Sequence, residues 1–347
     1  MAAAFKTILH GFLIGVANII PGVSGGSMAL ALGIYERLIV AVGNVAPSTL
    51  SAVFGVATFQ DGAGERFQAE WRRIDGSFLT WIAAGGAVAV VVFSEVMVWL
   101  IEQWHDPTYG FFCGLILVSI WIPLKMIRRF GAVQGLSALA ALGLVLVLTF
   151  SVDSEQQLDD ANRKLEMKRA GMQQATAMEV TQASSPLGQA DAGRMAFLVL
   201  CGAIAISAMV LPGVSGSFIL ILMGVYFDVL QAVNDRDLVI IGLFAIGCVL
   251  GLLLFTRLLK RLLATFHDAT IAFLTGLMIG SLAGLWPFRD FETVGDVNVG
   301  FERVDFGWII PAIDANTLWT VVAFFIGSGL VIAFIKQDQD KAEKKGG

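Results

Sequence analysis

The chain has few charged, metal-binding or nucleophilic side chains. Only 15% of its 347 residues are Asp, Glu, Lys or Arg, whereas a soluble protein carries about 25%. Its three cysteines, Cys113, Cys201 and Cys248, lie inside apolar runs and are expected to be small buried hydrophobes. The sequence lacks a His-Glu-x-x-His motif, a cysteine pair at ligand spacing and a glycine-rich nucleotide loop. We therefore expect no metal, no cofactor and no nucleic-acid partner.

What the chain has in abundance is apolar sequence, since 56% of its residues are hydrophobic. A membrane span needs about 20 consecutive apolar residues. The composition therefore predicts an all-α polytopic membrane protein. Its apolar segments run over 5–20, 23–42, 78–101, 108–124, 132–151, 195–211, 214–232, 238–256, 269–286 and 316–335.

A Pro-Gly motif interrupts two of these apolar stretches. Pro21-Gly22-Val23-Ser24-Gly25 recurs as Pro212-Gly213-Val214-Ser215-Gly216. The match continues without a gap, pairing Gly33 with Gly224, Tyr35 with Tyr226 and Ala41 with Ala232. The short segments on either side of each motif are either full spans or the two arms of a re-entrant hairpin. Broken apolar helices in matching positions of two halves indicate the binding site of a transporter.

The repeat extends over most of the chain. His105-Asp106 matches His267-Asp268, and Gly85 matches Gly247 at the same offset. We expect a first repeat at 1–151, a polar outer linker at 152–193 and a second repeat at 194–347. Each repeat has five apolar segments, an odd number, so the second repeat starts on the opposite side of the membrane. The repeats are therefore expected to be inverted, each with a Pro-Gly-broken hairpin, either spanning or re-entrant, and three further spans.

The charges of the loops predict the orientation. With the N-terminus in the cytoplasm, 14 basic residues fall on the cytoplasmic side and 8 on the opposite side. The short loops follow the positive-inside rule, so both termini are expected in the cytoplasm. Residues 287–315 are expected to form a second outer loop.

The break predicts an anion site. Proline interrupts the helix hydrogen bonds, glycine lets the backbone turn, and a new helix would begin near Ser24. The unpaired N–H groups and positive dipole end of such a helix bind anions, typically phosphate. We expect Ser24 and Ser27 to add hydroxyl donors, and the glycines to let the anion approach. In the second copy, Ser215 and Ser217 would complete a cradle shared by both breaks.

Two other interpretations of the motif are weaker. Close helix packing explains the many glycines, but packing alone does not require Pro-Gly and serine in both halves. Gly22-Val23-Ser24-Gly25-Gly26 also fits the Gly-x-Ser-x-Gly pattern of serine hydrolases. That pattern requires a preceding strand and a nearby histidine base, and an apolar helix is expected here instead.

Ionisable residues within apolar runs are candidates for function. Arg37 is expected at the cytoplasmic mouth, where it either attracts a headgroup or extends to the interface, and its repeat counterpart is Asp228. Glu95 and its repeat counterpart Arg257 are candidates for ion coupling, although Glu95 also fits an exposed position near a helix end. For His105-Asp106 and His267-Asp268 we expect the aspartates to cap helices.

The run from Gly11 to Ser27, continuing through Gly33-Ile34-Tyr35-Glu36-Arg37, resembles the bacterial domain-of-unknown-function 368 family. The second Pro-Gly-Val-Ser-Gly belongs to the same pattern, and the resemblance covers nearly the whole chain. It implies a polyprenyl-phosphate transporter that returns undecaprenyl phosphate from the outer to the inner leaflet of the cytoplasmic membrane for envelope polymer synthesis. The family residues fall on Asn18, Pro21, Gly22, Ser24, Gly25, Gly26, Ser27, Glu36, Arg37, Pro212, Gly213, Ser215 and Gly216.

The second copy departs from this pattern, because Ser217, Phe218 and Asp228 replace Gly26, Ser27 and Arg37. The first half is therefore expected to bind phosphate more strongly. The residues alone indicate only an anion-handling transporter. The first hypothesis is a lipid-phosphate transporter that works by alternating access around the two breaks, in contact with membrane lipids. A transporter or channel for a small soluble anion and a membrane lipid phosphatase are the alternatives. Coupling to protons, coupling to sodium and passive flow are all compatible with the sequence.

Overall fold

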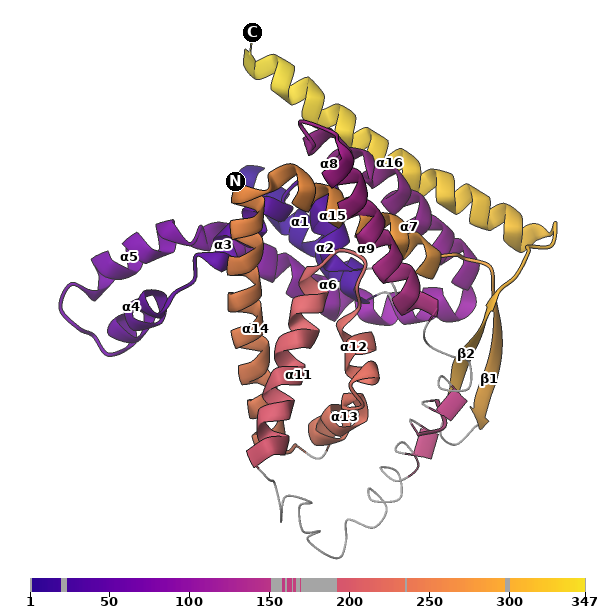
Figure 1. Cartoon of the computed structure of the whole chain (residues 1–347), viewed down its shortest axis with the longest axis horizontal. Helices are drawn as coiled ribbons and strands as arrows, with labels where there is room; N and C mark the ends of the chain where they lie inside the picture. The colour runs from indigo at the N-terminus through magenta and orange to yellow at the C-terminus, as the bar shows by residue number, and fades with distance from the viewer. Residues whose placement is uncertain are drawn as a thin grey trace, which may run out of the picture.

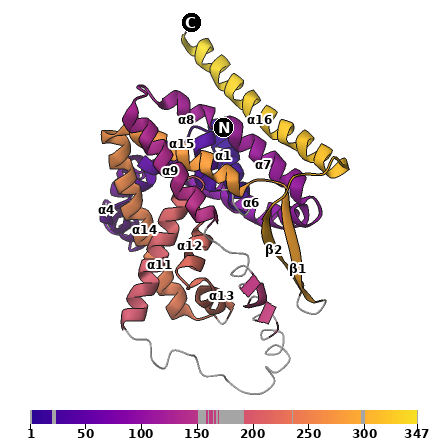
Figure 2. The ribbon, with the colours of Figure 1, turned by 45° about the vertical axis from the view of Figure 1, so that its right-hand side comes forward.

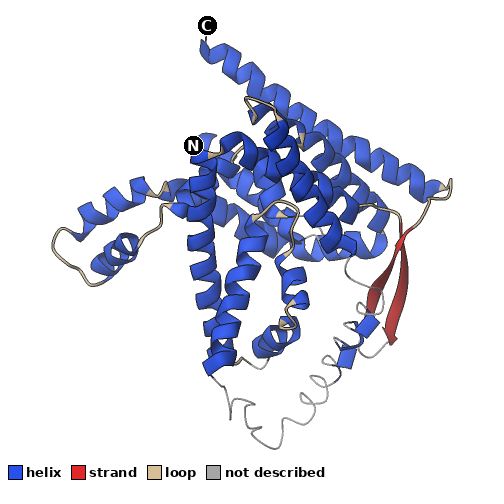
Figure 3. Ribbon diagram, in the orientation of Figure 1, coloured by secondary structure: helices blue, strands red, loops and turns tan. Residues whose placement is uncertain are grey.

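The computed structural model is a bundle of α-helices with one β-hairpin (Figures 1 and 3). The structure describes residues 2–19, 24–150, 158–159, 161–163, 165–166, 169, 192–234, 236–296 and 300–346. Among these residues, 6 helices are long and apolar enough to cross a membrane. They are Gly76–Phe93, His105–Met126, Ala132–Phe150, Gly193–Val210, Leu238–Thr265 and Ala315–Ala333. The expected helical polytopic architecture is confirmed.

The first half of the chain contains nine helices in its described part. They are α1 (Ala2–Ile19), α2 (Gly25–Ala31), α3 (Tyr35–Gly43), α4 (Pro47–Ala57), α5 (Ala63–Arg73), α6 (Gly76–Gln103), α7 (His105–Ser119), α8 (Trp121–Met126) and α9 (Ala132–Phe150). The expected apolar segment 23–42 is not one helix, because α2 and α3 are bent by 119°. Gly33 permits this bend, since its φ of 67° lies in the left-handed region that glycine adopts readily.

The second half has a similar order of elements. It comprises α11 (Ala192–Val210), α12 (Gly216–Leu222), α13 (Tyr226–Asn234), α14 (Leu238–Thr265), α15 (His267–Gly284), β1 (Arg289–Asp296), β2 (Gly300–Trp308) and α16 (Ala315–Gly346). The lengths match too: α2 and α12 have 7 residues each, and α6 and α14 have 28 each. Gly224, with φ of 71°, stands where Gly33 stands in the first half. The order differs in two places: the described residues of the second half contain no helices between α13 and α14, and a β-hairpin stands where α8 stands in the first half.

The long helices pack in matching pairs. Helix α1 packs on α6 as α11 packs on α14, and α7 packs on α16 as α15 packs on α9. The last helix of each half therefore packs against the other half. Glycines allow the close approach: a Cβ on Gly85 would lie 2.1 Å from the carbonyl oxygen of Ile8, and one on Gly247 would lie 2.1 Å from that of Val199. These four residues occupy equivalent repeat positions.

The buried core surrounds the short helix α2. Four residues of this core are at most 1% exposed: Leu30 on α2, Ile116 on α7, and Leu277 and Met278 on α15. They belong to one apolar cluster that also includes Ala17 at the end of α1. Packing of this cluster holds the first break between the two halves of the chain.

Two segments differ from the sequence expectation. Residues 289–296 and 300–308, expected within an outer loop, form the antiparallel strands β1 and β2, with an irregularity between Asp290 and Phe291. Helices α4 and α5 form a helical hairpin that the apolar pattern did not predict. Most of the expected linker 152–193 lies outside the described residues. Figure 2 shows both chain termini at one end of the bundle and the β-hairpin toward the other.

Candidate functional site

The two Pro-Gly breaks meet inside the protein. Ser24, the residue before α2, donates a hydrogen bond from Oγ to the carbonyl oxygen of Leu211 at 3.1 Å. Leu211 immediately precedes Pro212 of the second motif. The Tyr35 hydroxyl donates to the neighbouring Val210 carbonyl oxygen, also at 3.1 Å. Carbonyl groups at the C-terminal end of α11 lack partners within that helix, and Ser24 and Tyr35 of the first half supply them.

A glycine keeps this junction tight. A Cβ on Gly26 would lie 2.6 Å from the carbonyl oxygen of Val210 and 3.2 Å from the Pro212 nitrogen. No larger residue fits between α2 and the second break in this arrangement. Pro21 and Gly22, which we predicted as part of the site, lie outside the described residues.

The first N–H groups of α2 are capped by side chains of the chain itself. Gly25 N–H donates to Asn18 Oδ1 at 2.9 Å, and Gly26 N–H donates to Ser24 Oγ at 3.1 Å. Asn18 is exposed, whereas Ser24 is 7% exposed. Both side chains place an oxygen where an anion would accept these hydrogen bonds. Asn18 and Ser24 therefore occupy the positions that sequence analysis assigns to the oxygens of an anion.

Ser27 lies on the buried side of α2. It is 0% exposed, and its hydroxyl has no hydrogen-bond partner in the described part of the chain. A buried hydroxyl without a partner costs about 1–3 kcal/mol. Ser27 is thus brought close to the break, but it is not open to solvent in this conformation.

The second break is less polar than the first. Ser215 is the N-cap residue of α12, yet its side chain makes no capping hydrogen bond. Met209 stands where the first half has Asn18: a Cβ on Gly216 would lie 2.5 Å from Met209 Cγ. Gly213, with φ of 78°, packs on α15. A Cβ on Gly213 would lie 2.7 Å from the carbonyl oxygen of Leu277. The side chain of Ser217 is not among those described.

Arg37 lies away from the break. Its Nε donates to Asp75 Oδ2 at 2.7 Å, and its guanidinium lies 4.1 Å from the centre of the Phe78 ring. Its repeat counterpart Asp228 pairs with Arg194 at 3.1 Å. The matching residues Arg37 and Asp228 therefore each form an ion pair, with partners that are not repeat counterparts, and neither pair includes Ser24.

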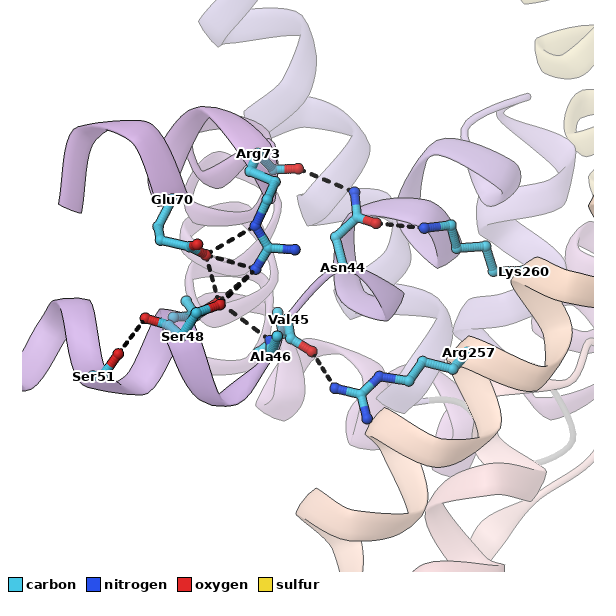
Figure 4. Close-up of polar contacts among 10 residues, drawn as sticks. Asn44, Val45, Ala46, Ser48, Ser51, Glu70, Arg73, Arg257 and Lys260 are labelled. Carbon is cyan, nitrogen blue, oxygen red and sulfur yellow. Dashed lines mark hydrogen bonds and ion pairs between the residues drawn. The ribbon is translucent and has the colours of Figure 1, made fainter. Parts of the chain in front are cut away.

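The two candidates for ion coupling, Glu95 and Arg257, lie in different environments. Glu95 is exposed on α6, where sequence analysis also allowed an exposed carboxylate. Arg257 on α14 donates to the carbonyl oxygen of Val45 at 2.6 Å, in the link between α3 and α4 (Figure 4). The structure gives Arg257 a role in joining the halves.

The two His-Asp pairs do not cap helices, which corrects the sequence expectation. Trp104 and Phe266 hold the N-cap positions, without side-chain hydrogen bonds. His267 Nε2 instead lies 2.9 Å from Glu36 Oε1, which joins α15 to α3. Asp268 accepts the Arg129 N–H at 3.0 Å. Sequence spacing could not reveal this link, because Glu36 and His267 lie 231 positions apart.

The fold and the site together indicate the class of protein to which the chain belongs. A polytopic helical protein whose broken helices meet in its interior, between matching halves, has the organisation of a membrane transporter. The chain belongs to the VCA0040-like family, described as undecaprenyl phosphate translocase-like, which matches residues 14–304.

Two curated relatives agree with this assignment. A polyprenyl-phosphate transporter of Vibrio cholerae serotype O1 is 34% identical over 285 residues, which cover 82% of this chain and 78% of that protein. A polyprenyl-phosphate transporter of Staphylococcus aureus is 28% identical over 289 residues, which cover 81% of this chain and 85% of that protein. Both relatives are transporters, which confirms the expectation that the chain is not an enzyme. No solved structure matches the chain.

Proposed function

We propose that this protein carries undecaprenyl phosphate from the outer to the inner leaflet of the bacterial cytoplasmic membrane. The names of both relatives support a polyprenyl phosphate as the substrate. Such a lipid has one phosphate headgroup and a long apolar tail. Only the headgroup must be shielded while it crosses the bilayer, because the tail can stay in lipid. The single observation that carries the site assignment is the meeting of both breaks at Ser24 and Leu211.

In this proposal the phosphate binds at the first break and displaces the chain's own caps. Its oxygens would accept from the N–H groups of Gly25 and Gly26, which Asn18 and Ser24 now satisfy. Exchange of one acceptor for another requires little net hydrogen-bond loss, and a charged acceptor makes the stronger bond. The Ser24 hydroxyl, released from Leu211, would donate to the phosphate, and Ser27 would gain the partner that it lacks.

The conformation described here is then a closed one. The hydrogen bonds from Ser24 to Leu211 and from Tyr35 to Val210 cross between the halves. In alternating access, these hydrogen bonds would break when the site opens toward one side of the bilayer. The inverted orientation of the repeats and the cytoplasmic placement of both termini, with re-entrant hairpins at the breaks, belong to this proposal. The matching element lengths and glycine contacts of the two halves support the repeat on which this arrangement depends.

The test is leaflet exchange of labelled undecaprenyl phosphate in liposomes that contain the purified protein. We expect exchange that depends on the protein and falls in the Ser24→Ala/Ser215→Ala double variant. Imposed proton and sodium gradients would show whether either ion drives the exchange. Absence of exchange under every gradient would refute the proposal. Uptake of soluble phosphate would then support the small-anion alternative, and release of phosphate from the lipid would support a phosphatase.

The Asn18→Asp variant is expected to fold normally and to lose most of its transport. Aspartate can still accept from the Gly25 N–H, and a negative charge is favourable at a helix N-terminus. The same charge would repel a phosphate by about 4 kcal/mol at 4 Å separation and an effective dielectric of 20. We expect exchange to slow by at least about tenfold, since each 1.4 kcal/mol is a factor of ten.

Asn18→Ser is the control for charge, because it adds no negative charge at the break and should retain more of the exchange than Asn18→Asp. Thermal midpoints of both variants in detergent verify folding. Wild-type exchange by Asn18→Asp would place the phosphate away from the first break.

A further inference from the structure

Helices α4 and α5 form a hairpin that breaks the symmetry of the two halves. It occupies residues 47–73 between α3 and α6, whereas only residues 235–237 separate α13 from α14. Figure 1 shows it projecting from the bundle beside α14. The packing of the long helices does not use it, so its presence calls for a separate explanation.

The two helices of the hairpin have opposite character. Helix α4 exposes large apolar side chains, with Leu50 67%, Val53 50% and Phe54 65% exposed. These three residues lie on one helix face by their spacing. Phe59, just after α4, is 92% exposed. Helix α5 instead carries the exposed polar residues Glu65, Arg66, Gln68 and Arg72.

Small residues join α4 to α5. A Cβ on Gly55 would lie 3.5 Å from the Ala63 side chain, and Ala52 is 7% exposed. The apolar face of α4 is therefore left without a partner in the described chain. Helix α4 has 11 residues, a length of about 16 Å. A bilayer core is about 30 Å thick, so α4 cannot span it.

The root of the hairpin is fixed to the end of a membrane span. Arg257 of α14 binds the Val45 carbonyl oxygen at 2.6 Å, and Lys260 Nζ binds Asn44 Oδ1 at 2.5 Å (Figure 4). Asn44 in turn donates to the Arg73 carbonyl oxygen at 3.0 Å, which ties the end of α5 to the same place. Arg73 also donates to the Glu70 carboxylate, and the hydrogen bonds from Arg73 hold the pKa of Glu70 below its ordinary value.

This root lies where the first cationic side chains of α14 appear. Residues 238–256 of α14 carry no charge, and Arg257 and Lys260 then lie on either side of Leu258, which is 52% exposed. Trp81, near the start of α6, is 41% exposed. Tryptophan is enriched where a membrane meets water, and cationic side chains extend to that level. The hairpin thus leaves the bundle at the membrane surface.

We propose that the α4–α5 hairpin is an in-plane membrane anchor, whose α4 face inserts at the boundary between lipid headgroups and acyl chains. An apolar helix face beside a polar one is the pattern of helices that lie in this interface. The root of the hairpin is bonded to the first cationic side chains that follow the long apolar run of α14, which identifies the bilayer as the occupant of the apolar face of α4. Because α3 leads directly into α4, insertion holds α3 and the first break at a fixed depth.

Photolabelling of the native full-length protein tests this anchor. The protein is placed in vesicles whose lipids carry a diazirine near the glycerol end of the acyl chain, and labelled peptides are identified by mass spectrometry. We expect several-fold more label in residues 47–59 than in residues 63–73. The internal comparison of the two helices corrects for differences in reconstitution. Equal labelling of both helices, or labelling of neither, would overturn the proposal.

Two variants test whether the apolar face of α4 is the part that inserts into the membrane. Phe54→Glu should reduce the label in residues 47–59 several-fold, whereas Gln68→Glu on α5 should not change it. Cross-linking of α4 between two copies of the chain, in place of lipid labelling, would assign the face to self-association and refute the membrane anchor. Labelling does not require turnover, so the result stands whether or not undecaprenyl phosphate is transported.

Discussion

Alanine at Gly85 is expected to disrupt the packing of α6 on α1, whereas alanine at the adjacent Gly86 is expected to be tolerated. A Cβ at Gly85 would lie 2.1 Å from the carbonyl oxygen of Ile8, far inside van der Waals contact. That obstacle is backbone, so it cannot rotate away as a side chain can. At Gly86 the nearest atom, the carbonyl oxygen of Gly11, would lie 3.6 Å from the Cβ.

The size of the effect follows from the cost of overpacking. Extra methyl groups in a well-packed interior cost about 1–3 kcal/mol, and occasionally more. Because the contact at Gly85 is with backbone, we expect the upper end of this range. The measurement is the thermal midpoint of monodisperse protein in detergent, compared between the two variants. Equal midpoints for Gly85→Ala and Gly86→Ala would contradict the packing of α1 on α6.

The second half offers an independent version of the same comparison. A Cβ at Gly247 would lie 2.1 Å from the Val199 carbonyl oxygen, whereas Gly242 on the same helix has no such neighbour within 4 Å. Gly247→Ala should therefore lower the midpoint and Gly242→Ala should not. Similar losses for Gly85→Ala and Gly247→Ala would support the structural equivalence of the two halves.

The second large effect is expected from Ser24→Ala, which should reduce both stability and transport. Ser24 caps α2 through the Gly26 N–H and also bonds the Leu211 carbonyl oxygen. Loss of an N-cap costs about 0.5–2 kcal/mol, and the Leu211 carbonyl would lose a partner as well. If the Ser24 hydroxyl also donates to the phosphate, exchange should slow by about tenfold, since a hydrogen bond to a charged group contributes about 1.5–3 kcal/mol.

Ser215→Ala and Ser24→Thr are the matched controls. The Ser215 side chain does not cap α12, so Ser215→Ala should not cause the loss of helix capping that is expected of Ser24→Ala. Threonine can cap α2 and donate a hydrogen bond, so Ser24→Thr should retain most of both properties. Unfolding midpoints and liposome exchange separate the two effects. Equal behaviour of Ser24→Ala and Ser215→Ala would mean that the first break has no special role.

Part of the site could be predicted from sequence because its signals are local. Proline and glycine interrupt a helix wherever they occur, and serine placed after them caps the next one. The structure places Ser24 at the N-cap of α2, close to where the sequence expected a helix to begin. Asn18 was expected near the break for the same reason, and it caps Gly25.

Other residues were misread because their partners are distant in the chain. His267 and Asp268 appeared to be a local helix cap, yet they bond Glu36 and the N–H of Arg129 from the first half. Helix α4 was not predicted, because its 11 residues are too few for a membrane span. In the hairpin β1–β2, only Val304, Phe306 and Trp308 of β2 alternate with non-apolar residues, and β1 has no such pattern, so the pair was not distinguished from a polar loop.

The sequence by itself determined the membrane-embedded helical class, the duplicated halves and the positions of both breaks. Composition, repeats and backbone chemistry are properties of neighbouring residues, and they need no three-dimensional information. Only the tertiary structure decided that Ser24 meets Leu211, that each half lends its last helix to the other, and that Arg257 holds the α4–α5 hairpin. These contacts join segments that are far apart in the chain, and their geometry depends on how closely the helices can approach one another.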